Sequence, residues 1–149
     1  MSTPSPLRRY AVSCLWLAGL GHIVGGLVLT FGVDSGLFDW YHHDVLSRFW
    51  SGPPPSEALA QQRWMVALFG PTIENIGVWL LALSHWGGSQ RNPAAWLWLL
   101  AGIALWAIQD IAVSLRVGYY PHLWLDLAAC AALALPTLWL WRHDRRQSD

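Results

Sequence analysis

The stretch Gly70-Pro-Thr-Ile-Glu-Asn-Ile-Gly77 decides the fold, because it places the carboxylate of Glu74 near the middle of an apolar segment. That segment, residues 63–85, has the roughly 20 predominantly apolar residues that a helix needs to cross a bilayer. A charge at the centre of a spanning helix costs about 2.5 to 3.5 kcal/mol, so such residues usually face a protein interior and serve a function. Glu74 therefore indicates a candidate site inside a membrane protein.

The composition of the whole chain is that of a membrane protein. Of the 149 residues, 54% are hydrophobic, only 12% are charged, and 12 are Trp; soluble proteins average about 25% charged residues. Nine basic residues balance nine acidic ones, so the chain has no basic stripe for nucleic acid. The expected surrounding is the lipid bilayer, and no nucleic-acid partner is expected.

Three further segments have the length of a membrane crossing, which predicts an all-α, integral membrane four-helix bundle forming one domain over residues 1–149. The predicted spans are residues 10–31, 63–85, 94–116 and 122–141. The outer connection, residues 33–62, is long for a structureless loop. Its aromatic and charged residues over 37–50 predict an interfacial helix that lies over the outer mouth of the bundle as a lid.

The arginines predict the orientation of the chain in the membrane. Six of the nine fall on one side of the predicted spans: Arg8, Arg9, Arg91, Arg142, Arg145 and Arg146. Cytoplasmic loops carry an excess of basic residues, so both termini are expected in the cytoplasm. The expected location is the bacterial inner membrane, as a multi-pass protein.

The first span is rich in glycine and carries one histidine. The pattern Gly21-x-x-x-Gly25 predicts a close approach to another helix. His22 lies between these two glycines in the sequence. Pro71 removes a backbone hydrogen bond one turn from Glu74 and predicts a kink that leaves room for a pocket. We interpret His22 and Glu74 as candidate catalytic acid and base groups; the alternative is that they only hold helices together by hydrogen bonds.

Polar residues also follow one face of the third span and one face of the fourth, with helical spacing in each. With the inferred orientation they lie in the outer half of the bilayer or, like Glu74, near its midplane, and they predict an outer-half polar pocket. The expected ligand-binding residues are Trp106, Gln109, Asp110, Ser114, His122 and Asp126.

Two function classes remain open on these observations. The first is a pocket for a lipophilic small molecule with a polar head, such as a quinone, a sterol-like compound or a lipid. The second is an accessory or assembly subunit whose Trp-rich surface packs on a larger membrane complex or on further copies of the chain. No metal site is predicted, because His42 and His43 are adjacent, point apart on a helix and are expected to be solvated. No cofactor is assigned.

The whole chain resembles the small bacterial four-helix membrane proteins grouped as DoxX-like. The resemblance rests on its size, its four spans, the Gly-rich first helix with Gly21-His22, and polar residues such as Gln109-Asp110 in the third span. It implies an accessory role beside oxidoreductase or respiratory complexes. A second likeness is to the sterol-isomerase type of four-helix domain, which gathers His and acidic residues within the membrane. No continuous motif of that group is evident, so none of its catalytic residues is transferred.

Overall fold

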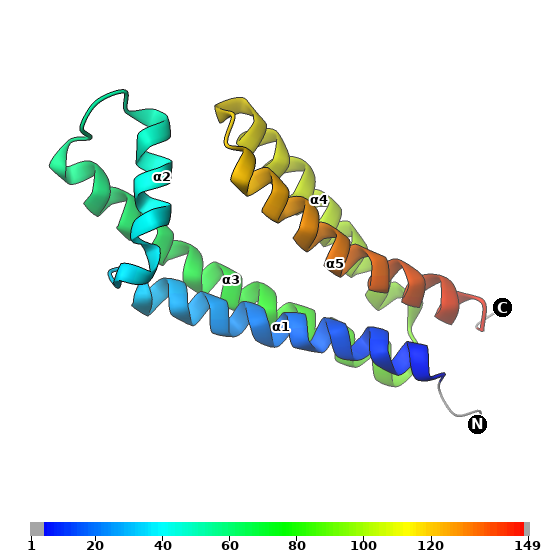
Figure 1. Ribbon diagram of the computed structural model, residues 1–149. Helices are drawn as coiled ribbons and strands as arrows, with labels where there is room; N and C mark the ends of the chain where they lie inside the picture. Colours follow the sequence, from blue (N-terminus) through cyan, green and yellow to red (C-terminus); the bar gives the residue numbers. More distant parts are fainter. Residues whose placement is uncertain (1–4, 148–149) are drawn as a thin grey trace. The chain divides into compact units, whose positions relative to one another are not determined.

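The computed structural model describes residues 5–147, which form an all-helical structure without a strand in that range (Figure 1). The elements in chain order are α1 (Pro6–Gly32), the 3-10 helix η1 (Gly36–Phe38), α2 (Asp39–Phe49), α3 (Ser56–Gln90), α4 (Pro93–Val117) and α5 (Tyr120–Arg145). Among the described residues, four of these helices are long and apolar enough to cross a membrane, namely α1, α3, α4 and α5. The predicted all-α membrane class is confirmed.

Each predicted span lies inside one of these four helices, and each helix runs past its predicted span. The largest extension is in α3, which begins at Ser56 and continues past Pro71 over 35 residues. The outer connection is therefore shorter than residues 33–62, because α2 and the first turns of α3 take up most of it. The prediction of a helix within residues 37–50 is confirmed by α2, while its place on the outer side of the membrane stays a prediction.

The chain divides into two compact units, which are described separately. In the described part of the chain, unit 1 comprises residues 5–19 and 79–147, and unit 2 comprises residues 20–78. The helices α1 and α3 therefore contribute one part to each unit, whereas α4 and α5 belong to unit 1. The single domain expected from the sequence stays a prediction.

Unit 1 is built on the hairpin of α4 and α5, which run side by side (Figure 1). The two helices are joined by Gly118 and Tyr119 alone. Gly118 has a φ of 64°, a left-handed conformation that favours glycine, and it ends α4. Its backbone N–H donates to the carbonyl of Leu115, and this sharp turn brings the end of α4 next to the start of α5.

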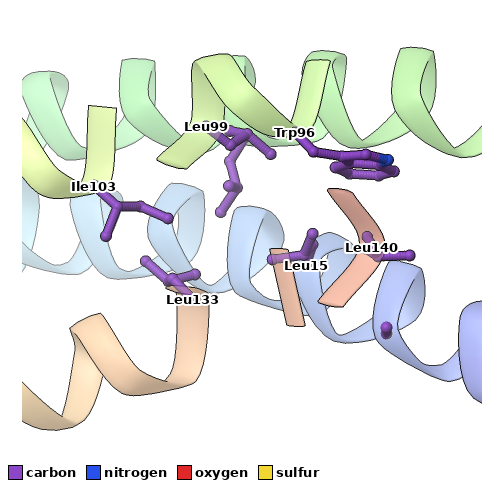
Figure 2. Close-up of a cluster of buried hydrophobic side chains, with 8 residues drawn as sticks. Leu15, Trp96, Leu99, Ile103, Leu133 and Leu140 are labelled. Atoms are coloured by element: carbon purple, nitrogen blue, oxygen red, sulfur yellow. The ribbon is translucent and has the colours of Figure 1, made fainter. Parts of the chain in front are cut away.

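The apolar core of unit 1 lies between these helices and the first half of α1 (Figure 2). Its labelled members are Leu15 of α1, Trp96, Leu99 and Ile103 of α4, and Leu133 and Leu140 of α5. In a bilayer, such side chains stabilise the contact between helices by van der Waals packing, because lipid tails are as apolar as the core itself. The core fixes α4 and α5 against α1 and so positions the polar residues that follow on the same helices.

A buried ion pair in unit 1, which we call the Arg8 clasp, joins α1 to α5. Arg8 Nε and Nη2 each donate to a different carboxylate oxygen of Asp144, both at 2.9 Å, and Asp144 is completely buried. Nη2 also donates to the carbonyl of Gly87 at 3.2 Å. Trp96 Nε1 donates to Asp144 Oδ2 at 2.9 Å. Arg8 is therefore a buried structural residue, and not only the interfacial positive charge that the sequence predicts.

In unit 2, α1 and α3 cross closely at Gly26 and Gly70. A Cβ atom added to Gly26 would lie 2.5 Å from the Gly70 carbonyl oxygen and 2.5 Å from Glu74 Cγ. The predicted contact at Gly21 and Gly25 is wrong in detail, since a Cβ on either would meet nothing within 4 Å. The rotation of α1 brings Gly26, rather than the Gly21-x-x-x-Gly25 pair, against α3.

The helix α2 is anchored within unit 2 by buried and charged contacts. His42 is 1% exposed, and its Nε2 lies 3.3 Å from the carbonyl oxygen of Val33. The prediction of a solvated histidine pair is therefore wrong for His42, while His43 is exposed. Arg63 of α3 adds an ion pair to Asp39 of α2 at 3.4 Å. These contacts hold α2 in place along the beginning of α3.

Candidate functional site

Five polar and aromatic side chains of unit 1 meet at the end of α4 and the start of α5, and we call them the α4–α5 polar cluster: Trp106, Asp110, Ser114, His122 and Asp126. One ring nitrogen of His122, Nδ1, lies near three of the other side chains. It lies 2.9 Å from Ser114 Oγ, 3.9 Å from Asp110 Oδ1 and 3.8 Å from Asp126 Oδ2. Trp106 Nε1 donates to the other oxygen of Asp110, Oδ2, at 3.0 Å.

Local sequence explains why these side chains meet. Trp106, Asp110 and Ser114 are four residues apart on α4, as are His122 and Asp126 on α5, so each set lies on one helix face. The two-residue turn then places the faces opposite each other. Gln109 is the one predicted ligand-binding residue that the structure leaves outside the cluster. It is exposed, and its amide donates to the Leu105 carbonyl at 3.0 Å.

Burial rises across the cluster from His122 and Asp110 to Asp126. The side chains of His122 and Asp110 are 36% and 30% exposed, which leaves them accessible, whereas the Asp126 side chain is 3% exposed. Asp126 Oδ2 is buried and accepts no hydrogen bond from any residue that the structure describes. A buried acceptor without a partner costs about 1 to 3 kcal/mol, and more when it is charged. This oxygen is therefore a place where a proton, a cation or a polar ligand group would bind favourably.

The cluster can perform two kinds of chemistry. His122 Nδ1 lies 3.9 Å from Asp110 Oδ1 and 3.8 Å from Asp126 Oδ2, so a proton can pass between them through one bridging water. The same three residues can also hold a metal ion, because one potential ligand atom from each lies within 4.8 Å of the other two. The sequence alone predicts the proton-exchanging groups but not a metal site.

Glu74 and His22, the two predicted catalytic residues, lie in unit 2. Glu74 is half-buried and faces α1, where its Oε1 lies 3.4 Å from Thr30 Oγ1, a hydroxyl that also has the Gly26 carbonyl as an acceptor at 2.9 Å. His22, Gly26 and Thr30 follow one another at four-residue spacing and so share a face of α1. A joint pocket of His22 and Glu74 with Asp110 and Asp126 stays a prediction. Thr30 was missed, although its spacing from His22 could have identified it.

Unit 2 also contains a groove between α2 and α3, which we call the α2–α3 groove. Its volume is about 510 Å³, within the usual range for small-molecule sites. Its walls include Tyr41, Phe49 and Trp50 from α2 and its end, and Gln62, Met65 and Phe69 from α3. The segment over 37–50 thus supplies Phe49 and Trp50 to this groove, while its place as a lid over the outer mouth of the bundle stays a prediction.

The polar groups of the α2–α3 groove are few. Both amide atoms of Gln62, Nε2 and Oε1, are buried and have no hydrogen-bond partner in the described part of the chain. Burial raises the pKa of the Tyr41 hydroxyl further above neutral pH, and the protonated hydroxyl can donate a hydrogen bond. An apolar groove with one unsatisfied amide and a phenol is suited to a molecule that is mostly apolar and has one polar group.

Comparison of the chain with protein-family models, with curated proteins and with solved structures gives no match.

Proposed function

We propose that the chain is a multi-pass membrane protein that binds a lipophilic small molecule with a polar head, such as a quinone, a sterol-like compound or a lipid. The observation that carries this proposal is the α2–α3 groove with its buried, unpaired Gln62 amide. The apolar walls favour a hydrocarbon body, and the amide offers a donor and an acceptor to a carbonyl or hydroxyl head.

Acid and base chemistry on that ligand is supported by the position of Glu74. Glu74 belongs to the same unit as the groove and follows Phe69, a groove residue, by five positions on α3. Five residues correspond to about 7.5 Å along a helix axis and about 140° around it, so Glu74 lies near the groove along α3 but on the side that faces α1. We propose Glu74 and His22 as the acid–base pair of this unit, in line with a sterol-isomerase-like activity.

A second candidate function is an accessory or assembly subunit of a larger membrane complex, as the DoxX-like resemblance suggests. It is favoured by large aromatic side chains that stay exposed on the spanning helices, among them Trp64, Trp79, Trp98 and Trp124, each more than 60% exposed. Exposed aromatic surface suits lipid headgroups, a partner subunit or a second copy of this chain.

Gln62→Leu is expected to weaken ligand binding about five- to tenfold, because it removes the groove's amide while keeping its size. The measurement is photocrosslinking of the purified protein in mild detergent with a diazirine-bearing quinone and a diazirine-bearing sterol, followed by peptide mapping. Gln61→Leu is the matched control, since Gln61 also lines the groove but is exposed. Crosslinks that avoid α2 and α3, or equal losses in both variants, would contradict the proposal.

We also propose a bacterial inner-membrane location with cytoplasmic termini, supported by the six arginines on one side of the spans. In a variant with Cys14 and Cys130 replaced by Ser, a cysteine at position 52 is expected to react with a membrane-impermeant thiol reagent in spheroplasts. A cysteine at position 89 is expected to react only after lysis. Labelling of position 89 without lysis, and none at position 52, would show the opposite orientation.

A further inference from the structure

We propose that the α4–α5 polar cluster binds one divalent transition-metal ion of the zinc class through Asp110, His122 and Asp126. The proposal starts from the spacing of the ligand atoms. His122 Nδ1 lies 3.9 Å from Asp110 Oδ1 and 3.8 Å from Asp126 Oδ2. In a tetrahedral zinc site with bonds of about 2.0 to 2.2 Å, neighbouring ligand atoms are about 3.3 to 3.6 Å apart. The three ligand atoms all lie within 4.8 Å of one another, so side-chain shifts of about 1 Å would close the cluster around an ion.

A second, independent observation separates this cluster from an ordinary group of polar side chains. Asp126 is 2% exposed, and its Oδ2 points toward His122 without a hydrogen bond from the described residues. A buried carboxylate oxygen in an apolar span is costly unless it is protonated, paired or bound to a metal. A cation between the three residues would supply the missing partner.

The surroundings of the ligands also fit a metal site. Ligands of bound metals are usually oriented by a hydrogen bond to an outer partner. Trp106 Nε1 makes such a bond to Asp110 Oδ2, which leaves Oδ1 directed at His122. The half-exposed side chains of Asp110 and His122 provide an entry path from one side. On binding, His122 Nδ1 would exchange its contact with Ser114 Oγ for the metal.

The ligand chemistry selects the metal class. One imidazole nitrogen and two carboxylates suit zinc, manganese or ferrous iron, whereas calcium prefers six to eight oxygen ligands and magnesium keeps an octahedral shell of oxygens. Two carboxylates and a neutral imidazole carry a charge of −2, which a divalent cation neutralises. Three protein ligands leave a position open, as in catalytic zinc sites. The proposal goes beyond the lipophile groove, which lies in unit 2, so each can fail without the other.

The test uses the full chain purified in mild detergent without a histidine tag and stripped with EDTA. Equilibrium dialysis against Zn²⁺, read by elemental analysis, is expected to give one equivalent per chain. Co²⁺ is expected to give a visible absorption spectrum that Zn²⁺ displaces. Asp126→Asn and His122→Gln are each expected to reduce the Zn²⁺ affinity by tenfold or more, while His43→Gln, which changes an exposed histidine, is expected to leave it unchanged.

Trp106→Phe keeps all three ligands and removes only the bond that orients Asp110. It is expected to reduce Zn²⁺ affinity about 10- to 100-fold, as loss of outer hydrogen bonds does elsewhere. This variant still tests the metal site if a substitution of a ligand residue prevents the protein from folding. Binding well below one equivalent in the parent protein, or equal affinity in the parent, Asp126→Asn and Trp106→Phe, would overturn the metal site.

Discussion

Asp144→Ala is expected to destabilise the protein by about 3 to 5 kcal/mol, because it leaves the buried guanidinium of Arg8 without its counter-ion. Arg8 is 5% exposed and donates two hydrogen bonds to Asp144 at 2.9 Å. The same change removes the acceptor of the Trp96 indole N–H, which is also completely buried. Unfolding by SDS in mixed micelles, followed by tryptophan fluorescence, measures the difference in the free energy of unfolding.

Two further variants show whether the loss comes from the Arg8 clasp. Arg9→Ala removes the adjacent but exposed arginine and is expected to change stability by less than about 0.5 kcal/mol. The double variant Arg8→Met with Asp144→Leu removes both charges together, so it is expected to be more stable than Asp144→Ala. A double variant that is less stable than Asp144→Ala would show that the stranded charge is not the source of the loss.

Adding a single methyl group at the crossing of α1 and α3 is expected to have the second large effect. In Gly26→Ala the new Cβ would lie 2.5 Å from the Gly70 carbonyl oxygen, and in Gly70→Ala it would lie 2.6 Å from the Gly26 carbonyl oxygen and collide with Thr30 Oγ1. Backbone atoms cannot rotate out of the way as the end of a side chain can, so the two helices would have to move apart. Overpacking of this kind costs about 1 to 3 kcal/mol or more.

The control variants come from the same glycine-rich stretch. Gly21→Ala and Gly25→Ala add the same methyl group where nothing lies within 4 Å. Because alanine is favoured over glycine in a helix by about 0.5 to 1 kcal/mol, these variants are expected to be neutral or slightly stabilised. Thermal stability in detergent compares all four. A loss of thermal stability in Gly21→Ala or Gly25→Ala as large as that in Gly26→Ala would contradict a close crossing of α1 and α3 at Gly26 and Gly70.

The four spanning helices could be predicted because each is a long, uninterrupted apolar run, and such a signal needs no knowledge of neighbouring helices. The α4–α5 polar cluster could be anticipated for a related reason. Asp110 and Ser114, like His122 and Asp126, are spaced by one helical turn, and the short connection makes the two helices neighbours. Both features depend on residues that are close in the sequence.

The features that escaped prediction depend on distant contacts. The partner of Arg8 lies 136 residues away, and no periodic pattern connects them. The choice of Gly26 over Gly21 and Gly25 depends on the rotation of α1 against α3, which a pattern of small residues on one helix does not specify. Likewise, His42 is buried because the chain folds back to the Val33 carbonyl, whereas its sequence neighbours suggested a solvated position.

The Arg8 clasp also limits how early during its synthesis the chain can complete its folding. At roughly 5 to 20 residues per second, the ribosome adds Asp144 about 7 to 27 s after Arg8. Until then the guanidinium must remain at the aqueous interface, which its long aliphatic stem permits. The pair forms only after every long helix has been synthesised, so a nascent or truncated chain that ends before Asp144 keeps an exposed arginine where the finished protein has a buried one.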